Sequence, residues 1–203
     1  MQKSLKKVLN GYLNFREKYT HSDESIMQYL SFYGQSPEIM VVSCCDSRVD
    51  PALILQCAPG DLFVIRNVAN IVPHYEKDEA HHGTSAALEF GIRFLNVKHL
   101  ILLGHSQCGG IKALLKNDKE EKTDFINNWV SLVNIPNCDH LSTDDYAKLA
   151  LKKSYQNCFT FPWIKEKVDN NELIIHLWFF DIKTCEILAC PSIEDEFSPL
   201  DIA

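Results

Sequence analysis

The fold is decided by the segment EIMVVSCCDSRVDPALILQCAPGDLFVIRN, residues 38–67. It opens with a short apolar run typical of a buried strand, and it closes with a second such run, DLFVIRN (61–67). Between them, DPALILQCAPG (50–60) indicates a brief helix with Asp50 as its N-cap and Pro59–Gly60 as its stop. A strand, a helix and another strand in this order favour a parallel sheet.

The same alternation continues along the chain. GTSAALEFGIRFLN (83–96) predicts a helix, and VKHLILLG (97–104) predicts a third strand that is apolar throughout. Ser142 and Asp145 form a capping-box pattern that marks the start of a later helix. The tail LIIHLWFFDIKTCEILAC (173–190) predicts two strands around a turn. We therefore expect an α/β fold, with a mainly parallel central sheet flanked by helices and an antiparallel C-terminal strand.

The first part of the chain differs from the rest because it contains no strand pattern. Residues 1–34 read as two helices, and the second of them is expected to end at Gly34. Apolar side chains follow helical spacing in the first, at Leu5, Val8, Tyr12, Phe15 and Tyr19. We expect residues 1–34 to form a helical arm that packs on the domain or on a neighbouring subunit. Residues 35–203 then form one α/β domain.

Composition excludes several classes of partner. The 203 residues carry a net charge of −7, so the chain lacks the basic surface expected of a nucleic-acid-binding protein. No apolar run approaches the roughly 18 residues that would span a bilayer, so no membrane association is expected. Eight cysteines occur without a recognisable secretory signal. Such thiols are typical of a reducing compartment, and a cytoplasmic location is expected.

Reactive side chains follow two of the predicted strands. Cys44, Asp46 and Arg48 come just after the first strand, and His105 and Cys108 come just after the third, within GHSQCGG. Because parallel neighbours end at the same edge of a sheet, these side chains are expected to meet there. Two thiolates and one imidazole suit zinc and leave a fourth position for water. The alternatives are a core thiol at Cys44, an H-x-x-C sequence without metal, and an ordinary surface ion pair.

The order C-x-D-S-R and then H-x-x-C-G-G resembles the signature of the β-class carbonic anhydrases. The likeness runs from about residue 35 to the end of the tail, and it is closest to the plant-like branch. It includes PGDLFVIRNVANIVP (59–73), GTSAALEFGIRFLNVKHLILLGHSQCGGIKALL (83–115), DFINNWV (124–130) and NNELIIHLWFFDIKTCEIL (170–188).

This resemblance implies one Zn²⁺ per chain, bound by Cys44, His105 and Cys108, and the reversible hydration of CO₂ to bicarbonate by zinc-bound hydroxide. Zinc brings the pKa of a bound water to about 7 in such enzymes. Asp46 would accept the hydrogen bond of that hydroxide, while Arg48 would keep the carboxylate ionised and correctly directed.

The resemblance also implies a substrate pocket, formed by Gln35, Phe63, Val68, Phe90 and Gly109. Gln35 would contact the substrate, the apolar side chains would line a site for CO₂, and Gly109 would allow a close approach of its backbone N–H. Phe90 departs from the family, which usually has a tyrosine there. Without the resemblance, Gln35 is a polar turn residue and the apolar positions are simply core.

Two other functions remain open at this point. Some relatives hydrolyse carbonyl sulfide or carbon disulfide on the same fold. A noncatalytic zinc-stabilised binding module is the other alternative, but it would be expected to lose Asp46, Arg48 or a ligand. Family members build their pockets between subunits, so a homodimer or a higher homo-oligomer is expected. His74, His81 and His82 lie in a polar loop, either as proton relays or as ordinary surface histidines.

Overall fold

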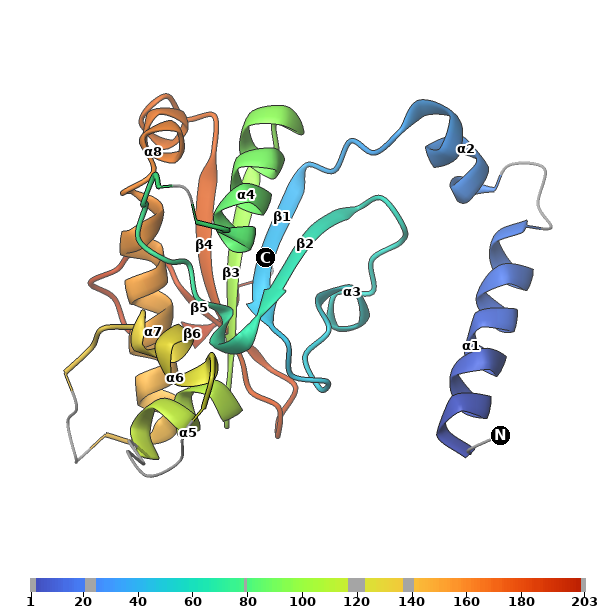
Figure 1. Ribbon diagram of the computed structural model, residues 1–203. Helices are drawn as coiled ribbons and strands as arrows, with labels where there is room; N and C mark the ends of the chain where they lie inside the picture. Colours follow the sequence, from blue (N-terminus) through green and yellow to red (C-terminus); the bar gives the residue numbers. More distant parts are fainter. Residues whose placement is uncertain (1–2, 21–24, 79, 117–122, 137–140, 202–203) are drawn as a thin grey trace.

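The computed structural model describes residues 3–20, 25–78, 80–116, 123–136 and 141–201. Its centre is a six-stranded sheet with the strand order β2-β1-β3-β4-β5-β6 (Figure 1). Four strands are parallel, namely β1 (Ile39–Cys44), β2 (Leu62–Asn67), β3 (His99–His105) and β4 (Ile174–Phe180). The antiparallel part consists of β5 (Ile187–Cys190) and the two-residue β6 (Ser198–Pro199). The predicted α/β fold is confirmed, and β6 is an addition to it.

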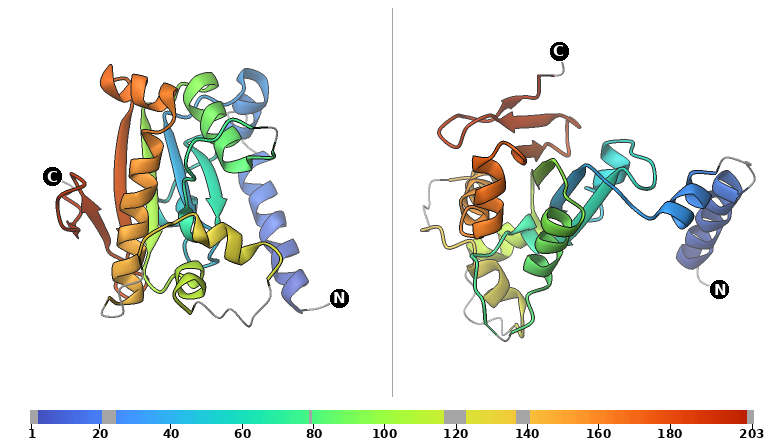
Figure 2. Two further views of the ribbon diagram at one scale, coloured as in Figure 1. Left: turned by 60° about the vertical axis from the view of Figure 1, so that its left-hand side comes forward. Right: turned by 90° about the horizontal axis from the view of Figure 1, so that it is seen from above.

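One face of the sheet is covered by helices, as Figures 1 and 2 show. These are α4 (Gly83–Glu89), the π-helical turn η2 (Phe90–Phe94), α7 (Thr143–Cys158) and α8 (Pro162–Asp169). Successive strand residues point to opposite faces, so alternate positions of each strand meet the helices. The resulting core joins Met40, Val42, Leu100, Leu102 and Leu177 of the sheet to Leu88, Leu151, Phe161 and Ile164 of the helices.

The segments that follow the parallel strands build the carboxyl edge of the sheet. β1 leads into α3 (Pro51–Ile54), β2 into the short turn η1 (Val68–Asn70), and β3 into α5 (Gly109–Lys116). Beside α5 and η1 lies α6 (Ile126–Ser131). Asp50 caps α3 as predicted, because its carboxylate accepts hydrogen bonds from the backbone of that helix. This edge is therefore made of short, hydrogen-bonded turns.

The N-terminal helices stand apart from the sheet (Figure 1, blue). They are α1 (Lys3–Thr20) and α2 (Ile26–Tyr33), and α2 ends at Gly34 as predicted. Leu30 of α2 packs against the backbone of Gly60, which has φ 97°. None of the side chains of Lys3–Thr20 is buried, although the helix carries an apolar stripe. Among the described residues, no helix has the length and apolar character needed to cross a membrane.

Candidate metal centre and active site

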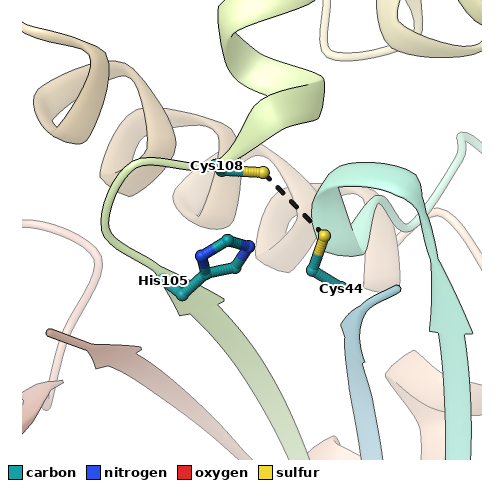
Figure 3. A group of neighbouring side chains, drawn as sticks. All are labelled: Cys44, His105 and Cys108. Carbon is teal, nitrogen blue, oxygen red and sulfur yellow. Dashed lines mark hydrogen bonds between the residues drawn. The ribbon is translucent and has the colours of Figure 1, made fainter. Parts of the chain in front are cut away.

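Three potential metal ligands converge at the carboxyl edge of the sheet (Figure 3). Cys44 is the last residue of β1, His105 is the last residue of its parallel neighbour β3, and Cys108 directly precedes α5. The Sγ atoms of Cys44 and Cys108 are 3.9 Å apart, and the three ligand atoms lie within 4.8 Å of one another. The residues are only 4%, 1% and 1% exposed, respectively. The convergence predicted from the strand ends is therefore present in the structure.

The imidazole of His105 is oriented for metal binding. Its Nδ1 lies 2.9 Å from the carbonyl oxygen of Ser106, so Nδ1 carries the proton and donates it to that oxygen. The lone pair of a neutral ring is then on Nε2. This atom is buried and has no hydrogen-bond partner among the described residues. A buried, unpaired acceptor is costly unless it binds something, and a cation held with two thiolates satisfies it.

The two thiols share a proton when no cation is present. The hydrogen bond from Cys108 is the main cause that lowers the pKa of Cys44 to about 4; the backbone N–H groups of Asp46 and Ala69 act in the same direction, and burial opposes them. The hydrogen bond with Cys44, together with burial, raises the pKa of Cys108. Cys44 therefore becomes a thiolate readily, and a bound cation is needed to ionise Cys108 as well.

The loop between His105 and α5 is fixed on both sides. The backbone N–H of Ser106 donates to Phe180 at the end of β4, and the Ser106 hydroxyl accepts the backbone N–H of Ile182. Gly110 is required by close packing, because a Cβ atom there would lie 2.7 Å from a side-chain carbon of Val68. The loop thus holds Cys108 against η1 as well as against Cys44.

Asp46 and Arg48 form a bidentate ion pair beside the thiols. Nε of Arg48 donates to Oδ1 of Asp46 at 2.9 Å, and Nη2 donates to Oδ2 at 2.7 Å. These hydrogen bonds hold the pKa of the Asp46 carboxyl well below its usual range. An ionised carboxylate can only accept hydrogen bonds, and two fixed donors determine where its remaining lone pairs point.

Arg66 holds this part of the chain in place. From β2 it donates to the carbonyl oxygens of Cys44 and Asp46 and to the carboxylate of Asp50. The loop that bears the first thiol and the ion pair is therefore tied to the neighbouring strand. In η1, Ala69 adopts the left-handed conformation with φ 65°, which is uncommon for a residue with a side chain and is often associated with functional sites.

Val68 is the member of the expected substrate pocket that lines a cavity at this edge. This cavity has a volume of about 510 Å³, and its lining also includes Cys45 and Trp129. Nε1 of Trp129 donates to the carbonyl oxygen of Val68 at 2.7 Å. Sequence reasoning did not assign Trp129 to the site, and the only signal for it was its place in the DFINNWV segment. Gly109 begins α5, and the space around its Cα is open.

Gln35, Phe63 and Phe90 lie elsewhere in the same chain. Gln35 is exposed and precedes β1, whereas the ligands follow that strand. Phe63 pairs with Met40, four residues before the Cys44–Asn67 pair, which corresponds to about 13 Å along the strand. Phe90 lies 5.8 Å from Phe63, centroid to centroid. The role predicted for these three residues in the pocket stays a prediction.

Comparison with known proteins identifies the family. A family model described as "Carbonic anhydrase" matches residues 39–187. Beta carbonic anhydrase 3 of Arabidopsis thaliana is 33% identical over 211 residues, which cover 92% of this chain and 81% of the relative. The chain belongs to the β-class carbonic anhydrases. The similarity to an Arabidopsis protein agrees with the plant-like branch predicted from the sequence.

Other β-class carbonic anhydrases match over almost the whole chain. A carbonic anhydrase of Synechocystis sp. is 35% identical, covering 95% of this chain and 73% of the relative. The solved structure of the β-carbonic anhydrase CcaA superposes with a TM-score of 0.85 at 34% identity, covering 98% of this chain and 93% of that one. β-Class carbonic anhydrases use zinc, and the buried Cys44, His105 and Cys108 provide the donor set that zinc prefers.

Proposed function

We propose that this carbonic anhydrase interconverts CO₂ and bicarbonate, with one Zn²⁺ per chain held by Cys44, His105 and Cys108. The observation that carries the proposal is the buried meeting of two thiols with the unpaired Nε2 of His105. A fourth side chain would be expected in a closed structural site, whereas three protein ligands are typical of catalytic zinc. The intact ion pair of Asp46 and Arg48 favours an enzyme over a noncatalytic zinc module.

Zinc, when bound, lowers the pKa of a coordinated water and so supplies a nucleophile at neutral pH. Asp46 is held ionised by Arg48 and accepts a hydrogen bond from the attacking water. That hydrogen bond leaves a lone pair of the water oxygen directed at CO₂. Arg48 also prevents Asp46 from turning toward the cation and blocking it. The two residues therefore orient the nucleophile rather than supply it.

The substrate pocket is proposed to form between two copies of the chain. Gln35, Phe63 and Phe90 lie at the opposite end of the sheet from the ligands of their own chain, so they reach a metal centre only in a neighbouring copy. A β-carbonic anhydrase of Sordaria macrospora with a TM-score of 0.78 and 26% identity is described as tetrameric. The exposed apolar stripe of α1 gives this chain a surface suited to such an assembly.

In the same proposal, residues 1–34 are the arm that contacts the neighbouring copy, and residues 35–203 are the catalytic domain. The cytoplasm is the proposed location. The seven cysteines within the described residues are all free thiols, which suits a reducing compartment.

Stopped-flow measurement of CO₂ hydration by the zinc-loaded protein, with carbonyl sulfide and carbon disulfide as competing substrates, tests the proposal. We expect the highest kcat/KM for CO₂, because the relatives that match this chain over most of its length are carbonic anhydrases. Asp46→Asn should retain zinc and lower kcat about a hundredfold, since the amide cannot replace a carboxylate that only accepts hydrogen bonds. Preference for a sulfur substrate, or a zinc-loaded protein inactive toward all three, would refute the proposed function.

A further inference from the structure

Two cavities share a wall near the carboxyl ends of β1 and β2. The cavity of about 510 Å³ contacts the strand ends through Cys45, Asn67 and Val68, and its other side includes Gly83, Thr84 and Trp129. A second cavity, of about 360 Å³, is lined by the same last three residues. The first turn of α4 and the indole of α6 thus separate a space at the ends of β1 and β2 from a second space that Pro73, His74 and His81 help to line.

The wall between the cavities carries polar groups that can hydrogen-bond to water molecules. Asn67 pairs with Cys44 across the strands, and its side-chain N–H donates to the hydroxyl of Thr84 at 3.3 Å. Since that hydroxyl accepts from Asn67, its own proton is available to donate to water. A second N–H···O contact joins the Asn67 amide to the carbonyl oxygen of Ile71, which keeps the amide in this orientation.

Histidines gather in the second cavity. His74, His81 and His82 all line it, together with the carboxylate of Glu76. His82 is the N-cap of α4 and is the partly buried member, whereas His74 and His81 are exposed. Imidazole is the side chain whose ordinary charge change falls between pH 5 and 8, so it exchanges protons with solvent under physiological conditions.

His82 is held in a definite orientation by Asp78. Its Nε2 lies 2.6 Å from Oδ1 of Asp78, and this hydrogen bond lowers the pKa of the exposed carboxyl. An ionised carboxylate cannot donate, so Nε2 of His82 must carry the proton in this contact. The lone pair of the neutral ring is then on Nδ1, which is the ring atom able to accept a proton.

We propose that His82, oriented by Asp78, accepts the proton released by CO₂ hydration, through water molecules that pass along Thr84 from the metal centre. This inference rests on the proposed function. Each turnover consumes one CO₂ and one water and releases one bicarbonate and one proton. The proton moves to Nδ1 of His82, and a buffer base in the solvent then removes it, so the imidazole returns to its neutral form. His82 is thus a relay residue that does not contact the substrate.

The test compares His82→Ala with wild type in dilute and in concentrated buffer. In dilute buffer the variant should lose about tenfold in kcat for CO₂ hydration, because proton removal then limits turnover. The value of kcat/KM and the exchange of ¹⁸O between CO₂ and bicarbonate should stay within about twofold of wild type, since neither requires the proton to leave the site. Added imidazole buffer should restore kcat.

His81→Ala is the matched control, because it removes a neighbouring, more exposed imidazole from the same cavity. An equal loss in this variant, or a normal kcat for His82→Ala in dilute buffer, overturns the assignment. So does a parallel loss of kcat/KM and ¹⁸O exchange, which would indicate a structural defect. Inactive wild-type protein instead refutes the proposed function, which keeps the two failures distinct.

A crystal structure of the zinc-loaded protein provides a readout other than activity. Hydrogen-bonded water molecules should join Thr84 Oγ1 to the imidazole of His82 on one side and reach the metal centre on the other. If side chains close the passage so that no water connects them, the relay is overturned.

Discussion

The two ends of the parallel sheet are built in opposite ways. At the carboxyl end, strand pairing and short turns bury Cys44, His105 and Cys108 together. At the amino end, Phe90 is exposed beside Phe63, and the N-terminal arm extends away from the sheet. One chain therefore completes its set of metal ligands but leaves the aromatic part of the expected pocket open.

The same contrast holds between two helices of similar length. The 16-residue α7 buries seven residues against the sheet, whereas the 18-residue α1 buries none. Both carry apolar residues at helical spacing, so the difference lies in what each one meets. An apolar face without a partner in its own chain has a lower free energy when it packs against a second copy than when it stays in water. The comparison separates helix α7, which a single chain stabilises by burial, from helix α1, whose apolar face needs contacts from an assembly.

The largest effect on activity is expected from removing a metal ligand at the carboxyl end of the sheet. Cys44→Ser should abolish zinc binding and lower CO₂ hydration by at least about a thousandfold, because a neutral hydroxyl replaces a thiolate ligand. Metal analysis and stopped-flow assays measure both. The adjacent Cys45→Ser is the control, since Cys45 is exposed and its Sγ is not part of the cluster. Full zinc content in Cys44→Ser would contradict the ligand set.

A smaller effect is expected at the other end, from Val8→Asp in α1. Val8 is 68% exposed in the single chain, so the variant should fold normally, but a charge on the apolar stripe should weaken self-association at least about tenfold. Sedimentation analysis measures the assembly. Activity should fall with it while zinc content stays constant, because the proposed pocket would lose the Gln35 and Phe63 side chains that a second copy contributes.

Asn10→Asp is the matched control for the arm, since it adds the same charge on the opposite side of the helix. If Val8→Asp left both the assembly and the activity unchanged, the pocket would not depend on a second copy. Loss of zinc in Val8→Asp would equally contradict the expectation that zinc binding at the carboxyl end of the sheet does not depend on the N-terminal arm.

The smallest effect concerns the packed helix α7. Asp145 accepts hydrogen bonds from the hydroxyl and the backbone N–H of Ser142, and these bonds lower its pKa. Because the folded-state pKa lies below the unfolded value of about 3.9, this stabilisation is complete above that pH and disappears as the pH falls through the folded value. Asp145→Asn should therefore cost about 0.5 kcal/mol at pH 7 and nothing in strong acid.

Chemical denaturation at several pH values measures this cost, and Ser142→Ala provides the matched background. In that background, Asp145→Asn should have a smaller effect, since the hydrogen bond from the Ser142 hydroxyl is already lost and only the backbone N–H of residue 142 still donates to Asp145. A stability difference that persists at a pH below the folded-state pKa would show that the carboxylate charge is not its source.

Most of the fold and the metal centre were accessible from sequence, for identifiable reasons. Apolar runs marked the parallel strands, and Cys44 and His105 lay at the ends of two of them. Because parallel neighbours end at the same edge of a sheet, the two residues were expected to lie close together. Asp50 and the pair of Ser142 and Asp145 marked helix starts through local capping chemistry. These features depend on residues close together in the chain, where the spacing of apolar side chains and the capping preferences of helix starts determine the local structure directly.

Other parts of the site carried no such local signal. The indole of Trp129 reaches the carbonyl oxygen of Val68 from 61 positions away. Ala69 takes a left-handed conformation that alanine does not favour by itself. The pairing of His82 with Asp78 is close in sequence, but the shared wall between its cavity and the one at the ends of β1 and β2 follows from the packing of α4 and α6.

The sequence by itself determined the order of strands and helices along the chain, the donor types available for zinc, and the family to which the chain belongs. Only the tertiary structure decided which side chains meet. It placed β1 beside β3, so that Cys44 faces His105, and it put Phe63 at the far end of β2 from the thiols. The physical reason is that local periodicity fixes each element, whereas register and strand order are set by burial and hydrogen bonding between distant segments.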